Sequence, residues 1–524
     1  MRRPLGNSRM DAMKMAQKKQ VLAFDFGASS GRAMLGSFDG NTISYQEIHR
    51  FSNDPVSIGG TLYWDVLRQF YEIKQGIVKA KQFGPIDSIA IDTWGVDFGL
   101  IAKDGTLLEN PVHYRDLRTT GLVEKSFSKI PKEEFYHLTG NQFMELNTVF
   151  QLYSLALNRP YQLERADCLL LMPDLFNYML TGVKASEYTN CTTTQLLDAA
   201  KGTWSQRVTE ALGIPSRLFT SIVQPGTVIG RLNPETCDEL GVDPIKVVSV
   251  ASHDTASAVA AVPAEEKDFI FNSCGTWSIF GTVVDSPVLN EKAVRYNLAN
   301  EGAAEGKTSL IRNILGLWMI QESRRQYQRE GFDYSYGDLE RLALREKPFA
   351  CFIDPDDPMF VPPGNLPRRV REFCEKTSQP VPETVGQVMR CIYESLAMKY
   401  RYTYEQLKDC TGKDYRAIHM IGGGTKDSLL CQMTANACGC TVTAGPIEAT
   451  VLGNIAMQLI ANGQIRDVDE ARQIIARSEK VLNYQPTEAG AYRTAYEIYL
   501  KVRYKALCGS FFIARASVEL TGTE

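Results

Sequence analysis

The chain has 524 residues, about twice what one hydrophobic core usually organises, so we expect two large domains. Its 44% hydrophobic and 23% charged residues, with 40 glycines and 23 prolines, exclude collagen-like, coiled-coil and disordered classes. Lys and Arg total 57 against 61 Asp and Glu, and a net charge of −4 gives no general attraction for nucleic acid or an anionic membrane. These values favour a globular protein with a small-molecule partner.

Twelve cysteines are too dilute for a disulfide scaffold and include no Cys-x-x-Cys pair. They predict buried thiols in a reducing compartment, and therefore a cytoplasmic protein. Residues 1–20 are basic and lack the apolar run of a signal peptide, so we expect a disordered leader there. No later apolar stretch is long enough to span a bilayer.

From Val21 to Phe51, apolar runs alternate with Gly/Ser/Asp/Asn clusters, which predicts a three-strand meander with a tight turn at Asp39-Gly40. A helix follows over 64–81, where apolar residues share one face, and short strands are expected over 86–91 and 96–102. Alternating strands and helices of this kind indicate an α/β fold, with a mixed sheet covered by helices.

The middle of the chain repeats the pattern of its start. The segment AFDFGASSGRAML (23–35) and the segment FIFNSCGTWSIFG (269–281) both read as apolar strand, small-residue turn and apolar strand. This similarity, close to mid-chain, predicts two related halves joined near 262–268. We therefore expect domains over 21–264 and 265–508, followed by a tail over 509–524.

The second half is also predicted to alternate helices with strands around an acidic, proline-bearing loop at 353–367. The expected helices cover 311–328, 383–408, the segment after the glycine turn at 422–425, 448–462 and 488–507, and the expected strands cover 417–421 and 440–444.

Three turns rich in glycine and hydroxyl residues follow apolar strands, at 27–31 with Arg32, at 273–276 and at 422–425. Free backbone N–H groups and hydroxyls in such turns can bind phosphate oxygens, although ordinary hairpin turns have the same composition. The sequence contains neither a Walker A motif nor a dinucleotide G-x-G-x-x-G motif after a strand, which argues against the two commonest nucleotide folds.

Two aspartates lie at the ends of apolar strands. Asp25 either caps its own turn or binds, directly or through water, the Mg²⁺ that accompanies a nucleotide. Asp254 lies where an apolar strand gives way to a small-residue helix, beside His253 and Thr255. It is either the N-cap of that helix or a general base that accepts a hydroxyl proton during phosphoryl transfer.

Polar and aromatic residues gather in two further segments, IDTWGVDFG (91–99) and HYRDLRT (113–119). Their candidates for binding sugar hydroxyls are Asp92, Trp94, Asp97, Arg115, Asp116 and Arg118, and the alternative for the same residues is a structural ion-pair network. Cys431, Cys438 and Cys440 with nearby His419 favour core packing over a zinc site, because no second Cys pair has zinc spacing.

Longer strings carry a more specific signal. They include FDFGASSGRAML (24–35), DTWGVDF (92–98), YRDLRT (114–119), EYTNCTTTQL (187–196), ASHDTASAV (251–259), SCGTWS (273–278), NEGAAEG (300–306), RNILGLWMIQ (312–321), GGGTKDSLL (422–430) and GPIEATVLGN (445–454). With these strings in this order, the sequence resembles the FGGY carbohydrate kinases from Val21 to about Ala461. Asp427 departs from the family pattern, where Asn is usual.

This resemblance implies two ribonuclease H-like domains with the actin-like ATPase fold, flanking a cleft for ATP and a ketose. It implies transfer of the γ-phosphate of ATP to a sugar hydroxyl with Mg²⁺, by a protein that is a monomer or homodimer. The implied site residues are Asp254 as catalytic base; Gly95, His253, Asp254, Thr255 and Asn313 as sugar contacts; Ala28, Ser29, Ser30, Gly31, Arg32, Thr276, Gln321 and Gly423 at the nucleotide; and Asp25 near Mg²⁺.

Two alternatives stay open at this point. The first is a kinase for a different deoxyketose, which would share all the catalytic strings. The second is a sugar-responsive protein of the same fold that binds ligands without transferring phosphate.

Overall fold

The computed structural model describes the backbone of residues 18–520 and the side chains of residues 18–506. Most of the predicted leader and the side chains of the predicted tail lie outside these residues. Packing divides the chain into two compact units. Unit 1 comprises Met1–Glu265, Val283–Leu310 and Glu448–Lys480, and unit 2 comprises Glu266–Thr282, Ile311–Ile447 and Val481–Glu524. The predicted domain limits stay a prediction, and packing assigns two later segments to unit 1.

The central sheet of unit 1 has six strands in the order β13-β14-β6-β1-β2-β3. Their bounds are β1 Lys19–Phe26, β2 Ser30–Phe38, β3 Ile43–Ser52, β6 Ser88–Thr93, β13 Thr227–Arg231 and β14 Lys246–Ser249. The first three strands form the predicted antiparallel meander, and β6 and β14 join it as parallel strands. Parallel strands that are buried on both faces suit the β-branched run of β6, which is buried along its whole length.

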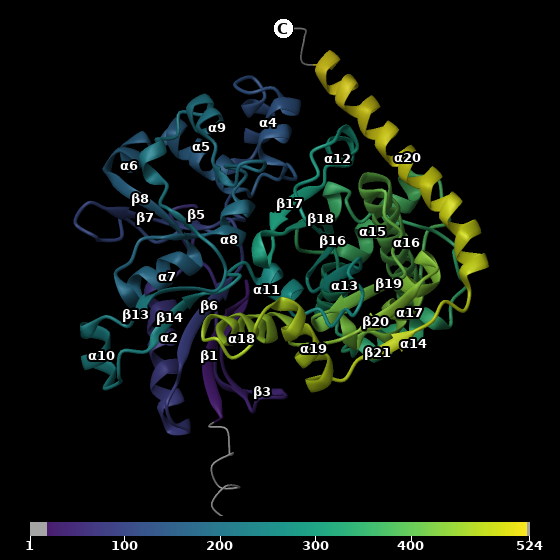
Figure 1. Cartoon of the computed structure of the whole chain (residues 1–524). Helices are drawn as coiled ribbons and strands as arrows, with labels where there is room; N and C mark the ends of the chain where they lie inside the picture. Colours follow the sequence, from purple (N-terminus) through teal and green to yellow (C-terminus); the bar gives the residue numbers. More distant parts are fainter. Residues whose placement is uncertain (1–17, 521–524) are drawn as a thin grey trace, which may run out of the picture. The chain divides into compact units, whose positions relative to one another are not determined.

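Helices of unit 1 pack on this sheet. The predicted helix over 64–81 is confirmed as α2 (Val66–Ala80), and Asp65 caps its start by accepting the backbone N–H of Arg68. The predicted helix over 448–462 is confirmed as α18 (Ala449–Ala461), which lies beside β1 and β6 (Figure 1). It also packs against α11 (Asp254–Ala260).

A second hydrophobic core of unit 1 forms around the antiparallel pair of β7 and β8. The other strands assigned to unit 1 are β4 Val56–Ile58, β5 Thr61–Tyr63, β7 Phe98–Ala102, β8 Ala166–Leu171, β9 Ser186–Glu187, β10 Leu197–Asp198, β11 Thr203–Trp204, β12 Ile222–Val223 and β17 Ala299–Gly302. Its other helices are α3 Leu122–Ser126, α4 Lys132–Thr139, α5 Thr148–Asn158, α6 Pro160–Arg165, α7 Met172–Thr181, α8 Tyr188–Thr193, α9 Gln206–Ala211, α10 Pro234–Leu240, α12 Glu291–Tyr296 and α19 Val468–Ser478.

Unit 2 contains strands in the order β16-β15-β19-β20-β21. Their bounds are β15 Ile270–Cys274, β16 Trp277–Val284, β19 Ala417–Ile421, β20 Thr441–Ala444 and β21 Leu482–Tyr484. Strand β15 pairs antiparallel with β16 and parallel with β19, as β1 does with β2 and β6. The two segments that the sequence sets side by side therefore occupy equivalent places in their sheets.

The helices of unit 2 include a long one, α16, where a helix was expected over 383–408. They are α13 Trp318–Arg329, α14 Tyr336–Leu344, α15 Leu366–Lys376, α16 Val385–Thr411, α17 Ser428–Cys438 and α20 Ala489–Leu520. The last helix continues well beyond the predicted end at Leu507.

The helix expected from Ile311 is wrong over its first part. Residues Thr308–Leu315 form a strand, β18, and the helix begins only at Trp318. Gly316 lies between the two elements, and a Cβ there would overlap the side chain of Ser278. The apolar residues whose spacing suggests a helix lie in a strand with few exposed residues. Such a strand lacks the alternation of apolar and polar side chains that is typical of half-exposed strands.

The described residues bear on two predictions, one about the cysteines and one about membrane-spanning segments. Nine of the eleven described cysteines are buried, in agreement with the prediction of buried thiols. Among the helices that the structure describes, none combines the length and the apolar character needed to cross a membrane.

Gly453 allows α18 to approach α11 closely. A Cβ at this position would overlap the carbonyl oxygen of Ser257, a backbone atom that no side-chain rotation can move. We expect Gly453→Ala to lower the free energy of unfolding by about 1–3 kcal/mol or more, through overpacking. Denaturant unfolding measures this loss. Gly490→Ala is the matched control, since a Cβ there meets nothing within 4 Å, and equal stability of the two variants would contradict the prediction.

Candidate functional site

Asp254 is the first residue of α11, at the end of the chain segment that follows β14. The N-cap position belongs to His253, so the structure does not support the N-cap alternative for Asp254. Its Oδ1 accepts the backbone N–H of Thr255 at 2.6 Å and the Thr255 hydroxyl at 3.2 Å. Its Oδ2 has no hydrogen-bond partner among the described residues, and the side chain is 34% exposed. One carboxylate oxygen is therefore available to a ligand.

Burial raises the pKa of Asp254, and the charge of Asp25 adds to this increase, whereas His253 opposes it. The exposed third of the side chain keeps water close and limits the change. A carboxylate that is exposed at one oxygen and has a raised pKa is suited to accept a proton near neutral pH.

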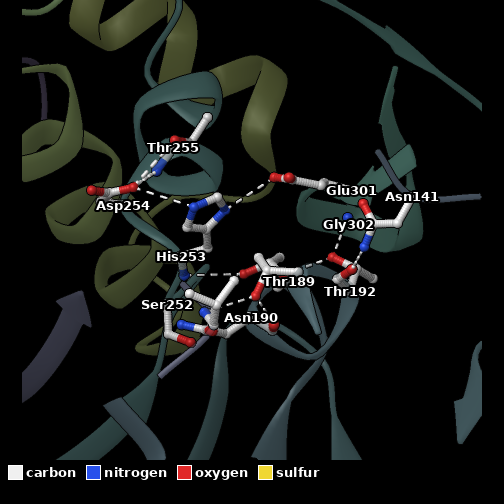
Figure 2. A network of polar contacts seen from close by, with 12 residues as sticks. Asn141, Thr189, Asn190, Thr192, Ser252, His253, Asp254, Thr255, Glu301 and Gly302 are labelled. Carbon is white, nitrogen blue, oxygen red and sulfur yellow. Dashed lines mark hydrogen bonds and ion pairs between the residues drawn. The ribbon is translucent and has the colours of Figure 1, made fainter. Parts of the chain in front are cut away.

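His253 lies between two carboxylates, as Figure 2 shows. Its Nε2 is 3.4 Å from Oδ1 of Asp254, and its Nδ1 is 3.2 Å from Oε2 of Glu301. Burial alone would lower the pKa of His253, but Glu301 and then Asp254 outweigh it and raise the pKa to about 9. His253 is therefore protonated at neutral pH, and its positive charge keeps the Asp254 carboxylate ionised.

Glu301 is a site residue that the sequence reasoning missed. It lies in β17, within the segment NEGAAEG (300–306), but nothing in the sequence distinguishes it from the many glutamates that lie on a protein surface. In the structure it is only 8% exposed. The signal that could have identified it is a carboxylate inside a short strand of small residues, which requires a partner when it is buried.

A second buried carboxylate holds the backbone below His253. Glu187, fully buried, accepts hydrogen bonds from the Ser252 hydroxyl at 2.6 Å, from the Ser252 N–H at 3.1 Å and from the N–H and hydroxyl of Thr189. The Thr189 hydroxyl is in turn 3.3 Å from the N–H of His253 (Figure 2). Glu187 thus fixes the turn that presents His253 and Asp254.

Asp25 and Asp92 lie side by side near the carboxyl ends of β1 and β6, which pair in parallel with these two residues in register. Arg32, opposite Asp25 on β2, donates to Asp25 at 2.5 Å and to Glu448 at 2.7 Å. Burial alone would lower the pKa of Arg32, but Asp25 and Glu448 raise it above its usual value. Arg32 is thus held as a cation beside the predicted metal residue.

This edge of the sheet fits a divalent cation. Asp92 is fully buried, accepts the Asn454 amide at 2.6 Å on Oδ2, and leaves Oδ1 without a partner. Its pKa is raised by burial and then by the charges of Asp25 and, less strongly, Asp254. Mg²⁺ commonly binds through one or two carboxylates and retained waters, so Asp25 and Asp92 supply a suitable donor set.

The first glycine turn has the geometry expected for anion binding. Ala28 and Ser29 are exposed, and their backbone N–H groups donate to no described residue. The turn is fixed by the Gly27 N–H to the Ser30 carbonyl at 3.0 Å and by Asn53, whose N–H bonds the Ser29 carbonyl at 3.1 Å. Gly31 is required where it stands, because a Cβ there would overlap the Phe51 ring.

The aromatic segment 91–99 has mostly a structural role. Asp97 is fully occupied by protein donors: the indoles of Trp64 and Trp94 at 2.6 and 3.0 Å, the Tyr114 N–H, and the Gln151 amide at 2.9 Å. Asp116 accepts two backbone N–H groups, from Leu62 and Arg118. Hydrogen bonds from protein groups therefore occupy both carboxylates and give these two aspartates a structural role.

Gly95 lies beside this network. A Cβ there would come within 2.9 Å of the Thr193 side chain, so only glycine fits without displacement. The next residue, Val96, has a positive φ of 69° and donates its N–H to the Thr193 hydroxyl at 3.1 Å. The backbone at Val96 is therefore held in an unusual conformation next to Gly95, and the predicted sugar contact of Gly95 stays a prediction.

The remaining predicted residues belong to unit 2. The Thr276 hydroxyl is 3.3 Å from Oε1 of Gln321, and the backbone N–H groups of Gly316 and Trp318 bond the Thr276 carbonyl. Gly423 begins a short turn after β19, with open space around its Cα. The flanking Gly422 and Gly424 pack against Cys274, so the second and third glycine turns adjoin one another. Asn313 lies on β18.

Two family models match nearly the whole chain. The C-terminal domain of the FGGY family of carbohydrate kinases matches residues 270–462, and the N-terminal domain of that family matches residues 20–261. The chain belongs to the FGGY family of carbohydrate kinases. It is accordingly an ATP-dependent sugar kinase by family.

Relatives and solved structures agree with this assignment. A rhamnulokinase of Bacteroides thetaiotaomicron is 42% identical over 480 residues, covering 91% of this chain and 98% of that protein. A rhamnulokinase of Oceanobacillus iheyensis is 41% identical and covers 88% of this chain and 97% of its own. The fold matches the ligand-bound xylulose kinase of Lactobacillus acidophilus with a TM-score of 0.80, at 20% identity, over 93% of this chain and 98% of that one. The fold is thus the actin-like ATPase fold of these kinases.

The contact between Glu301 and His253 makes a prediction for pH dependence. Without the Glu301 charge, burial would lower the pKa of His253, and a neutral His253 would no longer lower the pKa of Asp254. The Asp254 carboxyl would then hold its proton up to a higher pH. We expect Glu301→Gln to shift the acidic limb of kcat/KM to higher pH, measured as a full pH–rate profile.

The control for this experiment is Glu291→Gln, at an exposed glutamate in the first turn of α12. Its profile should match that of the unchanged protein. If the acidic limb stays in place in Glu301→Gln, then Glu301 does not act on the base through His253.

Proposed function

We propose that this chain transfers the γ-phosphate of ATP to the 1-hydroxyl of L-rhamnulose, giving L-rhamnulose 1-phosphate and ADP in L-rhamnose catabolism. The observation that carries the proposal is the free oxygen of Asp254 at the start of α11 in a chain 42% identical to a rhamnulokinase over 480 residues. Seven rhamnulokinases at 36–42% identity over about 90% of the chain support the choice of sugar.

The proposed chemical step uses Asp254 as the general base. The sugar oxygen forms the new bond to the γ-phosphorus, the bond from that phosphorus to the bridging oxygen of ADP breaks, and the hydroxyl proton passes to Oδ2 of Asp254. Because phosphoryl-transfer transition states are mostly loose, this proton moves late, and positioning supplies much of the rate. His253 keeps Asp254 ionised until the step occurs.

The proposed phosphate contacts are the backbone N–H groups of Ala28 and Ser29, with Ser30, Gly31 and Arg32 completing the turn. Thr276, Gln321 and Gly423 remain the proposed nucleotide contacts in unit 2, and Gly95, His253, Thr255 and Asn313 the proposed sugar contacts. Asp25 and Asp92 would hold Mg²⁺, which neutralises the charge that develops on the transferred phosphoryl group.

The first test is Asp254→Asn. The amide keeps the shape of the side chain but accepts no proton, so we expect sugar and ATP binding to persist while turnover falls by about 10²-fold or more. A coupled ADP-release assay measures turnover, and calorimetry measures binding.

Asp467→Asn serves as the matched control. Asp467 caps α19 by accepting the Glu470 N–H at 2.8 Å, and asparagine caps helices equally well. Near-normal turnover of Asp254→Asn would refute the base assignment. ATP binding without any phosphorylated sugar from the unchanged protein would instead favour a non-catalytic, sugar-responsive protein.

The second test concerns the sugar. Across a panel of ketoses that includes L-rhamnulose and L-fuculose, we expect L-rhamnulose to give the highest kcat/KM, with mass spectrometry identifying a 1-phosphate as product. A higher kcat/KM for L-fuculose or another deoxyketose would overturn the substrate assignment and leave the kinase activity intact.

A further inference from the structure

Three cysteines of unit 2 meet in the interior, away from every residue proposed for catalysis. Cys351 lies in the loop after α14, Cys374 near the end of α15 and Cys391 in the first half of α16, three helices that Figure 1 shows in unit 2. Their Sγ atoms all lie within 4.8 Å of one another, and the residues are 5%, 0% and 2% exposed. Within the part of the chain that the structure describes, no other group of three His, Cys, Asp or Glu residues meets this distance.

The spacing of the thiols suits a metal. At the usual Zn–S distance of about 2.3 Å, two sulfurs of a tetrahedral site are about 3.8 Å apart, within the upper limit found for this cluster. Thiolate ligands select soft or borderline cations such as Zn²⁺ over Mg²⁺ or Ca²⁺. The cluster therefore differs in its metal chemistry from the carboxylate edge of unit 1.

The backbone around Cys351 is fixed by hydrogen bonds on both sides. The Phe349 N–H donates to Oε2 of Glu394 at 2.8 Å, and the Ile353 N–H donates to the Ser395 hydroxyl at 2.9 Å, both on α16. Gln379 accepts the Phe352 N–H at 2.8 Å and returns its amide to the Phe352 carbonyl at 2.7 Å. The loop thus presents its thiol to the two helices without rearrangement, as preorganised ligand sites require.

The cluster is reachable through a cavity of about 270 Å³, whose lining includes Cys351 and Cys391. Charged residues around the cavity, among them Lys347, Arg390 and Glu394, make it polar enough to hold water. Such a cavity provides an entry path for an aqueous cation and room for a water molecule as a fourth ligand, as in zinc sites that keep an open position.

The three thiols also contact one another. Cys351 is within hydrogen-bonding contact of both Cys374 and Cys391. The three sulfur atoms are therefore already gathered at one point before a cation binds.

We propose that Cys351, Cys374 and Cys391 bind one Zn²⁺-class cation as three thiolates, with the fourth position open to the cavity. Binding forms three metal–sulfur bonds and releases to water the protons that the thiols carry, so affinity rises with pH. No oxidation or reduction is involved. The proposal is independent of the sugar kinase activity, because none of these residues belongs to the site in unit 1 or to the predicted nucleotide contacts.

Cd²⁺ is a suitable probe, since its bonds to thiolates absorb in the ultraviolet. We expect the full-length, reduced protein to bind one equivalent of Cd²⁺ with this charge-transfer absorption, and Cys374→Ser to lose it. The matched control is the double variant Cys438→Ser, Cys440→Ser, which removes the two described cysteines that are not fully buried. The control should keep the absorption of the unchanged protein.

A second variant guards against misfolding of Cys374→Ser, whose side chain is completely buried. Cys351→Ser changes a loop residue next to the cavity, and circular dichroism checks that its fold is retained. Zn²⁺ should raise the Tm of the unchanged protein and of the control, but not that of Cys351→Ser. The proposal is overturned if Cd²⁺ gives no stoichiometric absorption, if Cys351→Ser keeps it, or if the control loses it.

Discussion

Asp25, Asp92 and Asp254 bring three like charges to one edge of the unit 1 sheet, because β1 and β6 run in parallel and Thr93 at the end of β6 bonds the Ser252 carbonyl just before His253. The charge of Asp25 raises the pKa of both other carboxyls. Such crowding is unfavourable for stability, and apolar residues of similar volume would fold at least as well. The arrangement is therefore better explained by the proposed binding of a cation and a proton than by a contribution to stability.

The groups that offset these negative charges come partly from distant parts of the chain. Arg32 lies close to Asp25 in the sequence, whereas Glu301, which keeps His253 protonated, comes from the segment 283–310. Asn454, which donates to Asp92, comes from the segment 448–480. The close approach at Gly453 positions α18 so that its next residue can donate to Asp92. The site is complete only when three separate segments have packed into unit 1, which couples its electrostatics to the folding of the whole unit.

The sequence was informative where chemistry and local pattern coincide. The meander, α2, α16 and the position of Asp254 at the start of α11 follow from apolar periodicity, turn residues and an aspartate at a strand end. The sequence predicts a helix from Ile311, where residues 308–315 form a strand, because a strand with few exposed residues does not alternate apolar with polar side chains. The contact of Glu301 with His253 and the meeting of Cys351, Cys374 and Cys391 could not be predicted, since each depends on elements brought together only by tertiary packing. Asp97 shows the converse, a conspicuous residue whose partners are all structural.

A net charge of −4 and an acidic sheet edge are unusual surroundings for binding a polyanionic nucleotide. The net charge gives no long-range attraction, so the proposed recognition depends on short-range groups: the free N–H groups of Ala28 and Ser29, Arg32, and the proposed divalent cation at Asp25 and Asp92. Arg32 is already shared between Asp25 and Glu448 and carries one charge against several carboxylates. Without the cation, the edge would repel the phosphates that the glycine turn is proposed to bind. Metal dependence of phosphate binding thus follows from the charge balance of the site itself.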